Sequence, residues 1–124
     1  MPSWGGTLLR VGAMTVATAI LVQAFLAGRY LFGSLGIAVH GVIGNTTFGL
    51  AVALLVGALV TRAPRPVVVA AGILVLLLFA QVGLGYVGRT RAAAAAWHIP
   101  NGVAAFGVAT YLATRARPAP EPRT

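Results

Sequence analysis

Two histidines and two glutamines are the side chains that could do chemistry within this otherwise apolar sequence. Gln23 precedes His40 by 17 positions, and Gln81 precedes His98 by the same 17, so the set repeats at an offset of 58 (98 − 40). Imidazole is a ligand for transition metals, and a neighbouring polar group commonly orients it through its second ring nitrogen. The sequence therefore delivers one candidate metal ligand, with one candidate partner, in each of two copies.

The residues that follow the two histidines repeat as well. Both segments read H-x3-G-x3-F-G-x-A-x2-L, first in His40, Gly44, Phe48, Gly49, Ala51 and Leu54, and then in His98, Gly102, Phe106, Gly107, Ala109 and Leu112. Such a match indicates an internal duplication. Two copies of the same orientation are related by an axis along the membrane normal, which predicts that the histidines lie opposite each other across the centre.

The elements that must position these side chains are long apolar helices. Of 124 residues, 59% are hydrophobic and 8% are charged, which leaves too little polar surface for a water-soluble globule. Four apolar stretches, residues 8–27, 35–60, 67–87 and 92–113, each reach the ~20 residues that a helix needs to cross the hydrocarbon layer. We therefore predict an all-α membrane protein, a four-transmembrane-helix bundle built from a tandem two-helix repeat.

The domain organisation follows from the same pattern. Residues 1–114 form the predicted transmembrane domain, and residues 115–124, which are rich in Arg and Pro, form a predicted disordered cytoplasmic tail. Pro100 is expected inside the last helix, as a kink, because a helix that began there would be too short to span.

The arginines predict the orientation. Six fall on one side of the predicted bundle and three on the other: Arg10, Arg62, Arg65, Arg115, Arg117 and Arg123 against Arg29, Arg89 and Arg91. The positive-inside rule then places both termini in the cytoplasm of a multi-pass protein in the bacterial plasma membrane. Because the arginines flank the spans, the net charge of +8 is topological, and nucleic acid is not an expected partner.

With this orientation the repeated polar side chains share one depth. At 1.5 Å per residue, Gln23, His40, Gln81 and His98 all lie roughly 6 to 9 Å below the outer boundary. Polar residues at such a depth usually face the bundle interior and mark a site. Gly44 and Gly102, one turn deeper, would leave a flat slot between the second and fourth helices, and Phe48 and Phe106 would wall it.

A slot with an imidazole at the mouth of each wall suits a porphyrin. Two facing histidines favour a six-coordinate b-type haem, and the absence of C-x-x-C-H makes the attachment non-covalent. The glutamines could accept the second ring N–H of each histidine, and the outer arginines could pair with the haem propionates. The predicted site thus comprises His40 and His98 as metal ligands, with Gln23, Gln81, Gly44, Gly102, Phe48, Phe106, Arg29, Arg89 and Arg91 around the cofactor.

Simpler interpretations stay open for each of these residues. The glutamines can join helices by hydrogen bonds, the glycines can be plain packing positions, and the arginines can be topological only. Carboxylate catalysis and hard-metal sites lack their groups, since the sequence has no Asp and one Glu, Glu121. Two histidines are also too few for a protein zinc site.

Three short segments carry a resemblance to known proteins. Residues 22–28 (VQAFLAG), 40–44 (HGVIG) and 97–102 (WHIPNG) resemble a family of uncharacterised small four-helix membrane proteins common in high-GC bacteria. The placement of one histidine on the second helix and one on the fourth is also similar to one half of haem A synthase. This resemblance implies that His40 and His98 are axial ligands. The chain has one half only and lacks the acidic residue that the synthase uses, so synthase activity is not implied.

Taken together, the sequence favours a small b-type cytochrome with one haem near the outer face, exchanging electrons with a partner protein or a quinol. An electron carrier or accessory protein is favoured over an enzyme. The alternatives are a haem-free membrane scaffold or accessory subunit, and a protein of haem sensing or delivery. The expected partners are the lipid bilayer and that redox partner. The sequence does not specify an oligomeric state.

Overall fold

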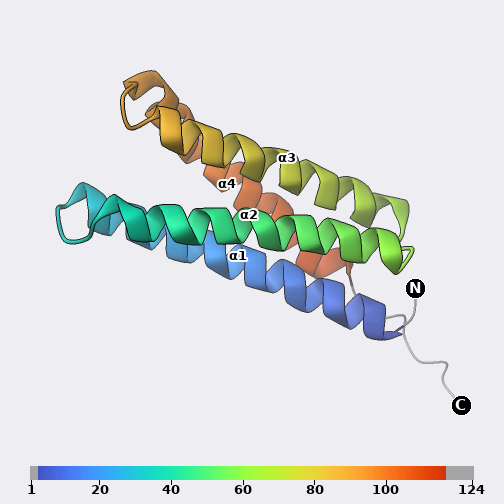
Figure 1. Cartoon of the computed structure of the whole chain (residues 1–124). Coiled ribbons are helices and arrows are strands. Elements are labelled where there is room, and N and C mark those ends of the chain that lie inside the picture. Colours follow the sequence, from blue (N-terminus) through green and yellow to red (C-terminus); the bar gives the residue numbers. More distant parts are fainter. Residues whose placement is uncertain (1–2, 117–124) are drawn as a thin grey trace, which may run out of the picture.

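The chain folds into four consecutive antiparallel helices (Figure 1). The computed structural model describes residues 3–116, and its helices are α1 (Ser3–Leu31), α2 (Ile37–Val60), α3 (Arg65–Val87) and α4 (Ala92–Arg115). Within that range there is no strand. The predicted all-α bundle is confirmed, with one helix for each apolar stretch.

Three of the helices are long and apolar enough to cross a membrane, namely Trp4–Leu31, Ile37–Val60 and Arg65–Val87. α4 is as long as α2, at 24 residues, but His98, Pro100 and Asn101 lower its hydropathy. It begins at Ala92 and runs through Pro100, as predicted. The fold is therefore that of a helical membrane protein, in which the fourth span stays a prediction.

The short connections explain where the helices end. After α1, Gly33 takes a left-handed conformation (φ 73°), which costs glycine little, and Ser34 Oγ donates to the carbonyl of Arg29 at 2.8 Å. After α2, Thr61 Oγ1 donates to Gly57 O at 2.7 Å, and two prolines open α3. After α3, Gly88 lies so close to α4 that an added Cβ would stand 3.1 Å from Ala95 Cα.

The four helices form a ring in which each packs against two others. α1 contacts α2 and α4, and α3 contacts α2 and α4. α2 and α4 are consequently diagonal to each other across the centre of the bundle. The tandem repeat predicts this relationship for the two helices that carry the histidines.

The packing is uneven along the bundle axis. We call residues 3–20, 47–78 and 105–116 the terminal half, and residues 21–46 and 79–104 the histidine half. The terminal half contains a continuous buried core of small and branched apolar side chains: Leu9, Ala13, Val16, Ala51, Leu54, Ala58, Ala63, Val67, Ala70, Ala71, Leu74, Leu78, Ala105, Ala109, Leu112 and Ala116. In the histidine half, Leu26 is the one buried residue. Figure 1 shows the two hairpins diverging toward the α1–α2 and α3–α4 loops.

The chain ends of the described region lie at the terminal half, beside the α2–α3 turn (Figure 1). α4 continues to Arg115, and Ala116 is buried against the bundle. The rest of the predicted tail, residues 117–124, lies outside the described residues. The turn arginines Arg62 and Arg65 share this end, whereas Arg29, Arg89 and Arg91 lie at the other.

Candidate functional site

The two histidines face each other across the diagonal of the bundle. His40 lies one turn into α2 and His98 two turns into α4, and their ring centroids are 6.0 Å apart with the ring planes tilted by 59°. Both side chains are half-buried. Residues that are 58 positions apart in the sequence therefore meet at one level of the histidine half.

This separation matches the requirement of one shared metal ion. Metal–imidazole nitrogen bonds are about 2.0–2.1 Å long, so two such bonds in line, together with the radii of two five-membered rings, give roughly 6 Å between ring centres. No group of three or more His, Cys, Asp or Glu side chains capable of holding a metal ion occurs within residues 3–116. The arrangement can thus supply two imidazole ligands, and any further ligands would have to come from a cofactor, from water or from side chains of other types.

Three polar atoms of the site make no hydrogen bond. The Nδ1 atoms of both His40 and His98 are buried and have no hydrogen-bond partner, and the same is true of Gln23 Oε1. A buried polar atom without a partner costs free energy, so each one calls for an explanation. All three unpartnered atoms belong to the repeated constellation. The 6.0 Å separation is the feature that fits a metal ion with two imidazole ligands. Ligation through Nε2 would leave each Nδ1 as a hydrogen-bond donor that needs an acceptor.

The first glutamine fills the space beside the first glycine. Gln23 Nε2 donates to the backbone carbonyl of His40 at 2.8 Å, and a Cβ added to Gly44 would lie 2.7 Å from that same nitrogen. Gly44 therefore accommodates the glutamine amide, which joins α1 to α2. The expected bond from the His40 ring to Gln23 is not formed here, because the amide nitrogen is turned toward the backbone instead.

The second glutamine repeats this placement with one difference. A Cβ added to Gly102 would lie 2.9 Å from Gln81 Nε2, so this glycine too makes room for its glutamine. The oxygen of Gln81, however, accepts a 2.6 Å hydrogen bond from Asn101 Nδ2, which also donates to the carbonyl of Leu77 at 2.8 Å. Neither glutamine side chain makes a hydrogen bond to a histidine ring within the described residues. It is the backbone of Gln23 that interacts with the His40 ring, and the backbone of Gln81 with the His98 ring.

The His98 ring rests on a further glycine. A Cβ added to Gly85 of α3 would stand 3.1 Å from His98 Cε1. The position that the repeat makes equivalent to Gly85 is Ala27. A side chain at Gly85 would push the His98 ring away by a few tenths of an ångström, so this glycine lets one candidate ligand pack closely on α3.

Arg89 is the predicted propionate partner that lies closest to the histidines. Its guanidinium lies 4.7 Å from the ring centroid of Tyr86, and its Nη2 would be 3.7 Å from a Cβ on Gly41, the residue after His40. Tyr86 Oη accepts a hydrogen bond from Asn45 Nδ2 at 3.2 Å. Since residues 3–116 contain no Asp or Glu, the guanidinium has no carboxylate partner there.

The remaining predicted residues lie farther from the pair. Phe48 packs on Phe79 of α3, with ring centroids 6.2 Å apart, and is half-buried, as is Phe106. Arg29 lies in the last turn of α1 and Arg91 precedes α4, and both side chains are exposed. The structure therefore brings together the histidines, glutamines, glycines and Arg89, whereas it leaves Arg29 and Arg91 at the rim.

Asn101, Tyr86 and Gly85 are neighbours of the site that sequence reasoning missed. Asn101 breaks the duplication, since its equivalent in the first copy is Ile43, and a polar residue at a position that is apolar in the other copy was the available signal. Tyr86 was overlooked because tyrosine is common at membrane–water interfaces whether or not a site is present. Gly85 gave no signal at all.

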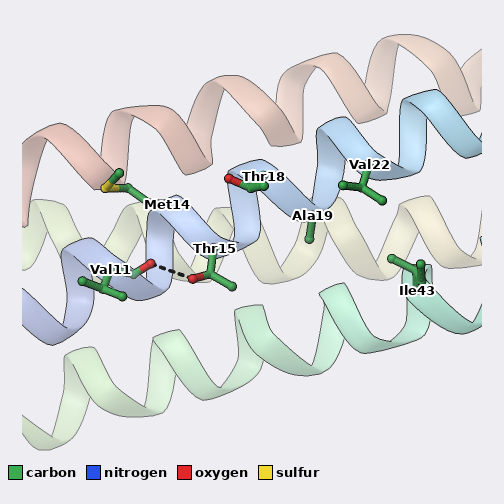
Figure 2. A pocket seen from close by; sticks show the side chains of 7 residues that line it. All are labelled: Val11, Met14, Thr15, Thr18, Ala19, Val22 and Ile43. Atoms are coloured by element: carbon green, nitrogen blue, oxygen red, sulfur yellow. Dashed lines mark hydrogen bonds between the residues drawn. The ribbon is translucent and has the colours of Figure 1, made fainter.

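Two grooves lie outside this site, on the apolar surface between α1 and α2. The larger, with a volume of about 520 Å³, is lined by Val11, Met14, Thr15, Thr18, Ala19, Val22 and Ile43 (Figure 2). The smaller, of about 300 Å³, lies beside it and includes Gly12 and Gly57. Neither contains a histidine, a glutamine or an arginine.

Comparisons with protein-family models, with curated proteins and with solved structures find no match to this chain. The interpretation of the site therefore depends on its own geometry.

Proposed function

We propose that the protein is a small membrane cytochrome that holds one non-covalent haem b between His40 and His98. The observation that carries this proposal is the pair of imidazoles, whose ring centroids lie 6.0 Å apart across the bundle. Bound haem would supply reversible one-electron transfer. The similarity of the histidine placement to one half of haem A synthase supports the same assignment.

The surrounding residues would hold the rest of the cofactor. The histidine half contains one buried residue, whereas the terminal half has a continuous core. A flat ligand would therefore disturb less packing in the histidine half than in the terminal half. Arg89 is the best placed cation for a propionate, with Arg29 and Arg91 at the rim. Phe48 and Phe106 would bound the porphyrin on the terminal side.

The electron path would stay on one side of the membrane. We infer that the histidine half faces the outer side of a bacterial plasma membrane, with four spans and both termini in the cytoplasm, because the arginine excess lies at the terminal half. The described terminal half offers no histidine for a second haem. The electron partner is therefore a quinol or a protein at the outer face, and the chain acts as a carrier rather than as an enzyme by itself.

An optical spectrum tests the proposal. The protein is expressed with haem available, purified in detergent and reduced; we expect a Soret band and a sharp α band that are lost in His40→Ala and in His98→Ala. Val39→Ala and Ile99→Ala are the matched controls, since these residues precede and follow a histidine with exposed side chains, and both should keep the bands. A colourless wild-type protein, also when isolated from its native membrane, would overturn the assignment.

A specific observation favours one other function, that of a haem-free scaffold or accessory subunit. The glutamine amides occupy the spaces beside Gly44 and Gly102 and join helices within each hairpin, as a purely structural layer would. In that case both histidine variants remain folded and no form of the protein binds haem. Haem sensing or delivery would instead show the same spectrum with rapid exchange of haem to an acceptor protein.

A further inference from the structure

The two copies of the repeat differ at the atom that could orient a ligating histidine. In the second hairpin, Asn101 occupies the oxygen of Gln81 with a 2.6 Å hydrogen bond. In the first hairpin, the equivalent position is Ile43, which has no donor, and the oxygen of Gln23 is buried and unpartnered. The duplication therefore leaves one free amide acceptor in the site and not two.

The free acceptor is held in place beside one particular histidine. Gln23 Nε2 donates to the carbonyl of His40 itself, and the amide rests on Gly44, one turn further along α2. Figure 2 shows Ile43 projecting from α2 toward Val22 and Ala19 of α1, where the second copy has Asn101 facing Leu77. Ile43 therefore offers no hydrogen-bond donor at the position where the second copy has the amide of Asn101, and the oxygen of Gln23 stays unused.

A histidine ring that ligates a metal can donate a hydrogen bond to this free oxygen. When one nitrogen of a neutral imidazole ligates a metal, the other carries a hydrogen and acts as a donor. Ligation through Nε2 would make the Nδ1 atoms of His40 and His98 the donors, and both are buried without a partner. The backbone of Gln23 interacts with the His40 ring and that of Gln81 with the His98 ring, so the backbone treats the two histidines alike. The one free side-chain amide oxygen belongs to the hairpin of His40 and is the acceptor that distinguishes them.

We propose that Gln23 is a positioning residue that accepts the Nδ1–H of His40 through Oε1, and that His98 has no amide partner of this kind, so that the two haem ligands are inequivalent. This inference rests on the proposed cytochrome function. An accepted hydrogen bond increases the basicity of the imidazole and stabilises the more positively charged iron. The first ligand is therefore the stronger one, and it sets the reduction potential of the site.

Three variants test the inference in the haem-loaded protein, with the midpoint potential and the haem dissociation constant as readouts. Gln23→Leu should raise the midpoint potential and weaken haem binding about 10- to 100-fold, the usual cost of losing such a partner. Gln81→Leu is the comparison at the equivalent position of the second copy. Its effect on the midpoint potential should be clearly smaller than that of Gln23→Leu, because its oxygen already serves Asn101. Ile43→Asn should raise the potential as Gln23→Leu does, because it copies the second hairpin and occupies the oxygen of Gln23.

Ile43→Asn distinguishes a Gln23 that orients His40 from a Gln23 that only joins two helices. Ile43→Asn keeps the Gln23 amide and its bond to the backbone of His40, so a merely structural glutamine would leave the potential unchanged. Equal shifts in Gln23→Leu and Gln81→Leu, or a shift in Gln23→Leu that Ile43→Asn does not reproduce, would overturn the inference. A wild-type protein without haem would be recognised earlier, by its spectrum, and would remove the proposed function together with this inference.

Discussion

The two halves of the bundle are made from the same duplicated sequence but are packed in opposite ways. In the terminal half, Ala51 and Ala109, which are equivalent in the repeat, are both fully buried where the helices meet. In the histidine half, His40 and His98 are also equivalent but are only half-buried. Small residues let helices approach closely, whereas amides and imidazoles hold them apart. The terminal half is accordingly the scaffold, and the histidine half is the part that can change.

The largest expected effect is that of the proposed haem on the histidine half. A ligand that binds only the folded protein stabilises it by about 4 kcal/mol when present at 1,000 times its Kd. We expect haem to raise the free energy of unfolding in mixed detergent micelles by that order in the wild-type protein and not in His98→Ala. Amide hydrogen exchange should slow mainly in residues 21–46 and 79–104. Equal slowing in both halves would mean that the terminal half is not a preformed scaffold.

Removing a core side chain from the terminal half should have the next largest effect. Leu74 is fully buried, so Leu74→Ala leaves a cavity. We expect a loss of about 2 kcal/mol in the free energy of unfolding, at the low end of the range for soluble cores, because lipid tails are as apolar as leucine. Leu76→Ala on the lipid-facing side of the same helix, where the side chain is 69% exposed, is the control and should be nearly neutral. A comparable loss in both variants would contradict the assigned core.

A smaller effect should come from the glycines that hold the glutamines. Gly44→Ala places a Cβ 2.7 Å from Gln23 Nε2, and Gly102→Ala places one 2.9 Å from Gln81 Nε2. Each should displace its amide and lower the free energy of unfolding by about 1 kcal/mol, the usual cost of an unsatisfied buried group.

The repeat supplies matched controls for this pair. Gly49 and Gly107 follow the same motif five positions later, and an added Cβ meets nothing within 4 Å at either site. Gly49→Ala and Gly107→Ala should therefore be neutral or slightly stabilising, since alanine favours the helix. If all four variants behave alike in the same unfolding assay, the glycines do not serve the glutamines.

The sequence predicted the four helices and the meeting of His40 with His98, because length, hydropathy and a duplication are properties of the chain itself. It did not predict the direction of the glutamine amides, since two acceptors lie within reach of Gln23, a backbone carbonyl and a ring nitrogen, and packing on Gly44 selects the carbonyl. Asn101 was missed for a similar reason. Its partners, Leu77 and Gln81, lie on another helix, and helix rotation decides which residues meet there.

The smallest expected effect concerns the bond that crosses between the hairpins at the open end. Asn45 Nδ2 donates to Tyr86 Oη at 3.2 Å, which joins α2 to α3 in the histidine half. Hydrogen bonds between membrane helices contribute on average about 0.6 kcal/mol, so Asn45→Ala and Tyr86→Phe should each lower the free energy of unfolding by about that amount.

A double-mutant cycle decides whether this loss belongs to the bond. Because both variants remove the same interaction, the double variant Asn45→Ala/Tyr86→Phe should cost little more than either single one. Tyr86→Phe also keeps the ring beneath Arg89, so it leaves that contact in place while it removes the hydroxyl. Strictly additive losses would show that the hydrogen bond between Asn45 and Tyr86 does not stabilise the protein.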